Sequence, residues 1–208
     1  MESRLPLFPL KLVAFPGEKV NLHIFEPRYR QLVGDLEAGD GRFGLCVYSD
    51  SLLPIGTLLE LSSVEKRYAD GRFDISCRAT RTFQIQHFFN PLPGKLYAGG
   101  DVVFREQQLV VIPYLMQQLM PYVQDFFRLM GHEKTYEAKT TTSFDLAHKL
   151  GLSLDQEYAL LLMPEEEERI SFLREHLLRV LPVLREAEKA RQRIQLNGHF
   201  KHLDPLDF

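Results

Sequence analysis

Glycines spaced as in a dinucleotide-binding loop occur in the stretch Gly-Asp-Gly-Arg-Phe-Gly at residues 39–44. In nucleotide-binding folds such a loop follows a strand and opens a helix, so that backbone N–H groups point at a pyrophosphate. Here the order is reversed, because a helical pattern precedes Gly39 and the strand-like run Phe-Gly-Leu-Cys-Val-Tyr follows it. The pattern therefore indicates a glycine turn, and we expect no cofactor.

The other side chains with catalytic potential are scattered along the chain. The sequence has no Gly-x-Ser-x-Gly elbow and no His-Glu-x-x-His helix, and its seven histidines are dispersed. His199 and His202 lie three residues apart with no cysteine nearby, whereas a structural zinc ion needs four ligands. His23 has apolar neighbours and is interpreted as a hydrogen-bonded structural residue. We expect no metal site, no catalytic residue and no enzymatic activity.

Charge and cysteine content restrict the partners and the compartment. The formal net charge is −3, which does not favour the basic face that phosphate binding needs. Residues 143–163 resemble a helix-turn-helix, but the second helix carries Asp155 and Glu157 without any Lys or Arg. Cys46 and Cys77 lie in strand-like runs and are interpreted as free thiols. Because no apolar run is long enough to cross a bilayer, we expect a cytoplasmic protein with no membrane or nucleic-acid partner.

Strand signals dominate the chain up to Arg105. Short aromatic and β-branched runs bounded by Gly, Asp and Pro occupy residues 20–25, 43–48, 71–79 and 82–88. Asp70-Gly71 predicts a hairpin turn. Between the first two runs, Pro27 begins a helical pattern that Gly39 ends. The fold class is therefore predicted as α+β, with residues 1–105 forming a β pseudo-barrel with one inserted helix.

After Arg105 the apolar period becomes helical, and residues 106–208 are predicted to form a helical bundle that ends in a long helix. One helix should begin at Pro113, and a short helix capped by Ser143 or Thr142 should end at Gly151. Ser153 and Gln156 have the spacing of a capping box. The four glutamates at 165–168 are interpreted as solvated residues in the first turn of the last helix.

Two apolar groups are candidates for contact with another polypeptide. Flexible thioethers and aromatic rings suit varied apolar partners, and one helical face carries Met116, Met120, Phe127 and Met130. Core packing is the favoured use of this face, since apolar residues at helical spacing usually face inward. The second group is Leu52 and Leu53, which we expect at an exposed barrel edge.

The run Glu-Pro-Arg-Tyr-Arg at residues 26–30 follows a strand directly and could be an anion site or scaffolding. Arg28 and Arg30 lie two positions apart, so on a helix they point in different directions and cannot clamp one phosphate together. Scaffolding is the better interpretation, with Arg28 or Arg30 paired to a carboxylate of the barrel.

Residues 5–33, Leu-Pro-Leu-Phe-Pro-Leu through Phe-Pro-Gly to Leu-His-Ile-Phe-Glu-Pro-Arg-Tyr-Arg, resemble the Lon protease N-terminal substrate-binding domain family, especially its stand-alone bacterial members. The resemblance extends over nearly the whole chain and implies a PUA-like barrel followed by a helical bundle. It supplies no catalytic residue. The matching motif residues, with a structural role, are Phe15, Pro16, Gly17, Phe25, Glu26, Pro27, Arg28, Tyr29 and Arg30.

The resemblance implies a non-catalytic module that binds unfolded or apolar protein segments, without the ATPase and peptidase domains of Lon. A separate protease or chaperone is then a possible partner. The alternative is RNA binding, because PUA-like barrels often bind RNA, although the sequence shows no basic cluster with interleaved aromatics. An enzyme whose site assembles from residues distant in sequence also stays open.

Overall fold

The computed structural model describes residues 2–132 and 134–199, and its contacts divide them into two compact units. Unit 1 comprises the described residues of 1–110 together with 143–166, and unit 2 those of 111–142 together with 167–208. The division differs from the predicted boundary after Arg105, because helices α3 (Ser143–Ala147) and α4 (Leu154–Leu162) belong to the unit of the strands. One reason is a hydrogen bond in which Ile55 N–H donates to the Tyr158 hydroxyl at 3.0 Å.

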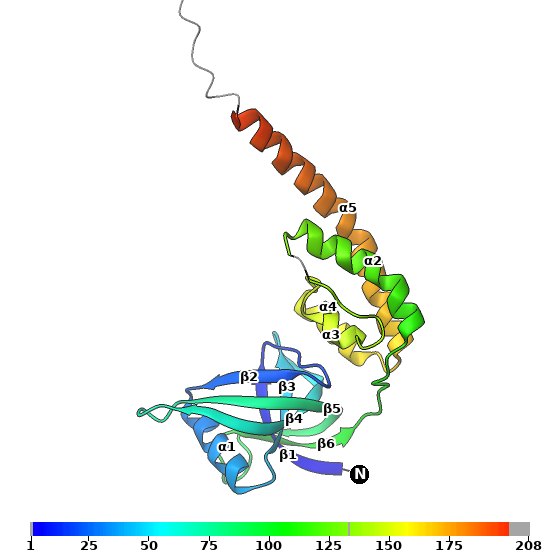
Figure 1. The fold of residues 1–208 in the computed structure, drawn as a ribbon. Coiled ribbons are helices and arrows are strands. Elements are labelled where there is room, and N and C mark those ends of the chain that lie inside the picture. The colour runs from blue at the N-terminus through cyan, green and yellow to red at the C-terminus, as the bar shows by residue number, and fades with distance from the viewer. Residues whose placement is uncertain (1, 133, 200–208) are drawn as a thin grey trace, which may run out of the picture. The chain divides into compact units, whose positions relative to one another are not determined.

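The described part of unit 1 has six strands (Figure 1), of which five form a closed ring and the sixth, β2, is attached to it through β5. They are β1 (Glu2–Leu10), β2 (Lys19–Ile24), β3 (Arg42–Tyr48), β4 (Leu52–Arg67), β5 (Phe73–Phe89) and β6 (Ala98–Phe104). The sheet order is β2-β5-β4-β3-β1-β6, and β6 pairs again with β5, which closes the ring. Only the β1–β3 pair among these is parallel. The predicted β pseudo-barrel is therefore present.

Strand β5 explains how β2 attaches to the ring. Its first part, Phe73 to Arg78, pairs with β2, and its later part, Phe83 to Phe89, pairs with β6. The sequence predicts two strands here, but they are one strand with register shifts in its ladders. The strand β1 was missed because it contains Pro6 and Pro9. It tolerates both, since the residues before Leu7 pair only with β6 and those after it only with β3.

The inserted helix α1 (Pro27–Ala38) covers the barrel with an apolar face. Pro27 begins the helix, as predicted, and the Gly39–Gly41 turn leads directly into β3. Gly41 has a φ of +72°, so the glycines serve a turn, as predicted, in place of a phosphate loop. Tyr29 is 4% exposed and its ring centroid lies 3.8 Å from that of Phe8. This contact joins the helix to the core of the barrel.

At the junction before α1, the partners of the two arginines differ from the expected barrel carboxylates. Arg28 pairs with Glu26, two residues away, at 2.8 Å. Arg30 donates to two backbone carbonyls, from Nε to Phe25 O at 2.9 Å and from Nη1 to Asp70 O at 2.9 Å. Arg30 therefore joins the start of the helix to the turn between β4 and β5, and the backbone supplies the acceptors that the sequence pattern could not reveal.

Local capping signals fix α4 and the start of α5 (Glu166–His199). Both hydrogen bonds of the predicted capping box between Ser153 and Gln156 are present. The prediction that the four glutamates at residues 165–168 are solvated is wrong for Glu166, which is 0% exposed. Its carboxylate accepts from Ser143 N–H and from the Ser143 hydroxyl, each at 2.7 Å, so it caps the start of α3.

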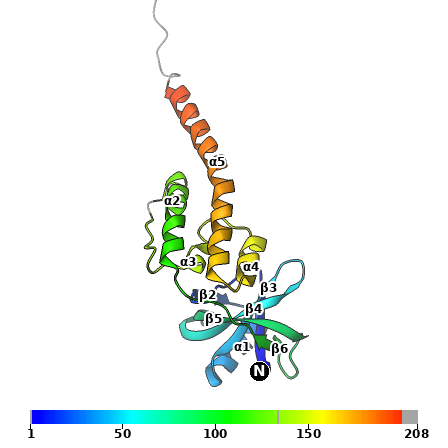
Figure 2. The same cartoon turned by 90° about the vertical axis from the view of Figure 1, so that its right-hand side faces the viewer.

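Unit 2 contains α2 (Pro113–Leu129), which lies beside α5 (Figure 2). Asp125 of α2 accepts from Arg185 of α5 at 2.6 Å, on the outside of this helix pair. Within residues 2–132 and 134–199, no helix has both the length and the apolar character needed to cross a bilayer.

Replacing Arg30 with alanine removes both of its bonds to backbone carbonyls. We expect Arg30→Ala to lower the free energy of unfolding by about 2 kcal/mol. The matched variant Arg28→Ala loses an exposed ion pair and should cost only about 0.5 kcal/mol. Urea denaturation of the two variants measures both effects, and equal losses would contradict the assignment of Arg30 as the joining residue.

Candidate functional site

The predicted contact residues are divided between the two units. Leu52 and Leu53 are half-buried on β4 in unit 1, so neither is the exposed edge residue that we expected. Met116, Met120 and Phe127 of α2 are buried inside unit 2, at 0%, 7% and 4% exposure. Only Met130 is exposed, at 49%. The favoured core interpretation of the stripe therefore holds for the three buried residues, which pack inward because they share one helical face.

A tight turn at residues 15–18 is the centre of a different candidate site. Glu18 N–H donates to Phe15 O at 3.1 Å, with Pro16 and Gly17 at the central positions. Gly17 has a φ of +94°, which fits the third residue of a type II turn and explains the glycine. A Cβ at Gly17 would meet nothing within 4 Å, so backbone conformation, and not space, requires the glycine.

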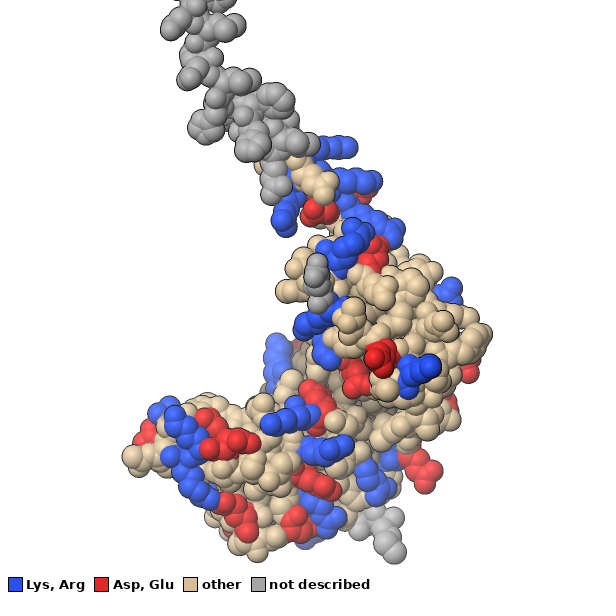
Figure 3. All heavy atoms as spheres, in the orientation of Figure 1, with Lys and Arg blue, Asp and Glu red and all other residues tan. Residues whose placement is uncertain are grey.

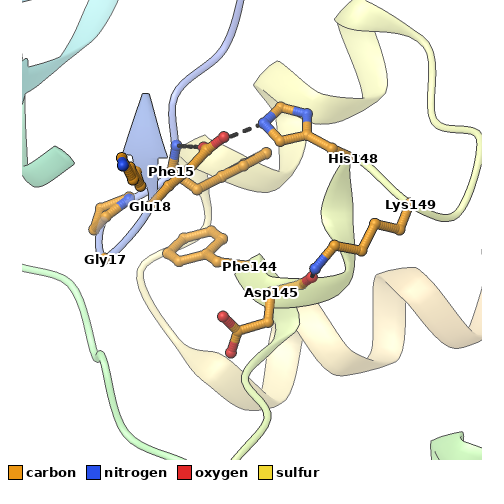
Figure 4. A pocket seen from close by; sticks show the side chains of 9 residues that line it. Phe15, Gly17, Glu18, Phe144, Asp145, His148 and Lys149 are labelled. Atoms are coloured by element: carbon orange, nitrogen blue, oxygen red, sulfur yellow. Dashed lines mark hydrogen bonds and ion pairs between the residues drawn. The ribbon is translucent and has the colours of Figure 1, made fainter. Parts of the chain in front are cut away.

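The carboxylate of Glu18 holds this turn to the helices α3 and α4 (Figure 4). Its Oε2 accepts from Phe15 N–H at 2.9 Å and from His148 Nε2 at 3.2 Å. On the other side of the ring, His148 Nδ1 donates to Glu157 Oε1 at 2.7 Å. His148 therefore bridges a carboxylate of the turn and a carboxylate of α4.

Two carboxylates keep the His148 imidazole charged. Burial by itself disfavours the charged ring, but the hydrogen bonds to Glu157 and Glu18 outweigh it and raise the pKa of His148 to about 9. The ring also lies against Phe15, with centroids 4.9 Å apart. A histidine held as a cation between two acceptors is a structural tie and a poor general base at neutral pH.

Three hollows adjoin the turn, each small. The His148 hollow, of about 310 Å³, is lined by Phe15, Pro16, Gly17, Glu18, Lys19, Phe144, Asp145, His148 and Lys149. The arginine hollow, of about 340 Å³, is lined by Pro16, Thr80, Arg81, Thr82, Arg105, Glu106, Gln107 and Leu109. The serine hollow, of about 300 Å³, is lined by Gly17, Lys19, Ser62, Ser63, Glu65, Ser76, Cys77 and Arg78.

The aromatic wall of the His148 hollow comes from two elements. The rings of Phe15 and Phe144 stack with centroids 5.0 Å apart, and the side chain of Lys149 turns back to donate to Asp145 O at 2.5 Å (Figure 4). The hollow thus combines an apolar wall with charged groups at its rim. Sequence reasoning missed it because residues 15–19 and 143–149 are far apart along the chain.

The thiols offer no chemistry to these hollows. Cys46 and Cys77 are both free and buried, and burial raises the pKa of each thiol, for Cys77 to about 12. Across the described ranges, no group of three His, Cys, Asp or Glu residues could hold a metal ion. The pair His199 and His202 lies outside the side chains that the structure describes.

The family comparison matches nearly the whole chain. The sequence profile described as the ATP-dependent protease La (LON) substrate-binding domain matches residues 4–179. The chain belongs to this family. The family predicted from the motif residues is therefore confirmed, and the turn at residues 15–18 and the α1 junction are parts of a Lon substrate-binding domain.

Solved structures share the fold. A Lon N-terminal domain protein from Xanthomonas campestris is 26% identical, with a TM-score of 0.60 over 82% of this chain and 96% of that chain. The N-terminal domain of the Lon protease from the Mycobacterium avium complex is 16% identical, with a TM-score of 0.63 over 84% of this chain and 98% of that chain. At 16% identity, the similarity to the second structure shows a shared fold alone.

The end of the β4–β5 ribbon, residues 66–72 of this Lon-family chain, carries a cluster of cations and aromatic rings that the sequence did not reveal. Lys66 and Arg72 both lie over the Tyr68 ring, at 4.5 and 5.0 Å. Carboxylates accompany these cations, however, as Figure 3 shows by the mixed red and blue side chains there. Arg72 pairs with Asp70 at 2.7 Å, and His23 has the predicted hydrogen bond, to Asp74 at 2.6 Å. Such pairing leaves little positive charge for phosphates.

The hydrogen bonds of His148 to its two carboxylates should make the stability of the fold depend on pH. The pKa of His148, about 9, lies above the ordinary value of 6.5, so the charged tie stabilises the fold fully below about pH 6.5. This stabilisation is lost as the pH rises through 9, and should amount to about 2–3 kcal/mol. We expect the difference in unfolding free energy between the wild type and His148→Gln to shrink over this range. Chemical denaturation at a series of pH values measures it, and parallel pH curves for the two proteins would refute the tie.

Proposed function

We propose that this chain binds exposed apolar segments of unfolded proteins and makes or breaks no covalent bond. The observation that carries the proposal is the family match, since the matching profile is described as a substrate-binding domain and spans residues 4–179. The three hollows at the turn support the absence of covalent chemistry in this proposal. They contain no activated thiol, and His148, which lines one of them, is held as a cation. The free, buried thiols are consistent with the reducing cytoplasm, where we place this activity.

We place the binding surface at the turn of residues 15–18. Each adjoining hollow is at the low end of the size range of ligand pockets, about 300 to 1,000 Å³. A row of small hollows fits successive side chains of an extended polypeptide better than one large cofactor. The turn joins the hollows, since Pro16 lines two of them and Lys19 also lines two. Of the six contact residues predicted from sequence, the half-buried Leu52 and Leu53 belong to the same unit as the turn and can contribute secondary contacts.

A separate protease or chaperone would act on the bound polypeptide in this proposal. RNA is the weaker candidate, because the cation and aromatic cluster at the end of the β4–β5 ribbon is accompanied by carboxylates such as Asp70 and Asp74. Binding of RNA depends on unneutralised positive charge beside stacking rings.

Titration against one protein in two states tests the function. A reduced and alkylated, apolar-rich polypeptide should bind to the chain, because it exposes apolar segments that the folded form buries. The same protein in its folded form should not bind. Fluorescence anisotropy of a labelled client measures both, and equal affinity for the two forms, or no binding to either, would contradict the proposal.

Site-directed blocking tests the position of the surface. The native thiols are buried, so a maleimide attached to a polyethylene glycol chain should modify only an introduced cysteine. Lys19→Cys places the polymer between two hollows, and Lys11→Cys places it at an exposed lysine that lines none of the three. Modification at residue 19 should abolish client binding, while modification at residue 11 should leave it unchanged. The same effect at both positions would mean that the surface lies elsewhere.

A further inference from the structure

The serine hollow gathers hydrogen-bond donors from three neighbouring strands. Lys19 of β2 lies opposite Arg78 of β5, and Ser63 of β4 lies opposite Ser76 of β5. The ladder between β4 and β5 shifts register between Leu61 and Ser63. Such a bulge allows consecutive residues to share a face, and both Ser62 and Ser63 line the hollow. Three hydroxyls and two cationic side chains therefore converge on one small space.

Several of these donors have no partner among the residues that the structure describes. The residue Ser76 is 2% exposed, and its hydroxyl forms no hydrogen bond with any residue that the structure describes. The Ser76 oxygen is not fully buried, so it can reach a group that enters the hollow. Lys19 and Arg78 likewise form no ion pair within residues 2–132 and 134–199. The accessible Ser76 hydroxyl and the two exposed cations line the same hollow, and together they fit an acceptor from outside the chain.

The charge of the hollow selects the class of ligand. Glu65 also lines it, but its carboxylate accepts from the Ser63 hydroxyl at 2.6 Å. Lys19 and Arg78 therefore leave one positive charge in excess of Glu65. A single carboxylate matches this balance, whereas a phosphate dianion would leave uncompensated negative charge beside Glu65. Hydroxyls and a guanidinium are suitable donors to a carboxylate.

We propose that the serine hollow binds a carboxylate of the polypeptide whose apolar side chains occupy the neighbouring His148 hollow. This inference rests on the proposed function and adds a specificity to it. The two hollows share Gly17 and Lys19, so an acidic group can enter one while an adjacent apolar residue lies against the other. The preferred segment is therefore apolar with a carboxylate close by, either the chain terminus or an Asp or Glu side chain.

Three peptides with one apolar core test the proposal. The first has a free C-terminal carboxylate, the second is amidated, and the third is amidated with an Asp placed next to the core. Binding to the wild type and to Arg78→Gln is measured by isothermal titration calorimetry. We expect the wild type to bind the first or third peptide about fivefold more tightly than the second, and we expect Arg78→Gln to lose this preference.

Two further variants make the result specific. Ser76→Ala should reduce the preference for a carboxylate without weakening the binding of the amidated peptide, because only one hydroxyl that lines the hollow is removed. Lys11→Gln, a matched loss of one exposed charge outside the hollow, should leave the preference intact. Urea denaturation confirms that each variant is folded.

The outcomes separate this proposal from the proposed function. Binding of all three peptides with equal affinity, unchanged in Arg78→Gln, would overturn the carboxylate site and leave polypeptide binding in place. Failure of every peptide to bind the wild type would overturn both. Competition by inorganic phosphate, but not by acetate, would also overturn the assignment, since it would indicate a phosphate site.

Discussion

The candidate site depends on the hydrogen bonds that the carboxylate of Glu18 accepts. This carboxylate accepts from Phe15 N–H within the turn and from His148 across the hollow, so a single side chain closes the turn and attaches the helices to it. The second acceptor, Glu157, is 13% exposed at its side chain and accepts from the other ring nitrogen of His148. A partly buried charge stays stable only while its partners are present. The Phe15 and Phe144 wall therefore depends on a short chain of charged hydrogen bonds.

The barrel supplies the other half of the site through the sharing of β5. Its first part pairs with β2 and β4 at the same time, which places side chains from three strands on one outer face. Lys19, Ser76 and Arg78 have their positions fixed by this ladder, and the bulge near Ser63 adds two hydroxyls. Donors that are positioned before a ligand arrives lose less entropy on binding. The pairing of β5 with both β2 and β4 thus fixes the backbone positions of the residues that line this hollow.

Features with a local cause could be predicted from the sequence. The inserted helix was predicted from Pro27 and from the spacing of Tyr29, Leu32 and Val33. The start of α4 was predicted from Ser153 and Gln156. Each of these signals acts within a few residues. The alternation of Ile75 and Cys77 similarly identified the buried face of β5. Where the signal was ambiguous, as for the prolines of β1, only the partner strands decide the outcome.

The site itself could not be predicted, because its parts meet only through tertiary structure. Glu166 belongs to an acidic run that looks solvated, yet the start of α3 buries it. His148 lies 130 residues from Glu18 in sequence, and no spacing rule joins them. The motif Phe15-Pro16-Gly17 did mark the right place, but as a family pattern whose physical role, a type II turn between hollows, required the backbone conformation.

Hydrogen exchange of the chain, free and saturated with an unfolded client, tests the central claim most directly. Binding at the turn predicts slower amide exchange in residues 15–19, 62–65, 76–78 and 143–149, because a bound polypeptide covers their backbone. The end of the β4–β5 ribbon, residues 66–72, should exchange at the same rate in both states. Protection of the ribbon end with none at the turn would contradict the account.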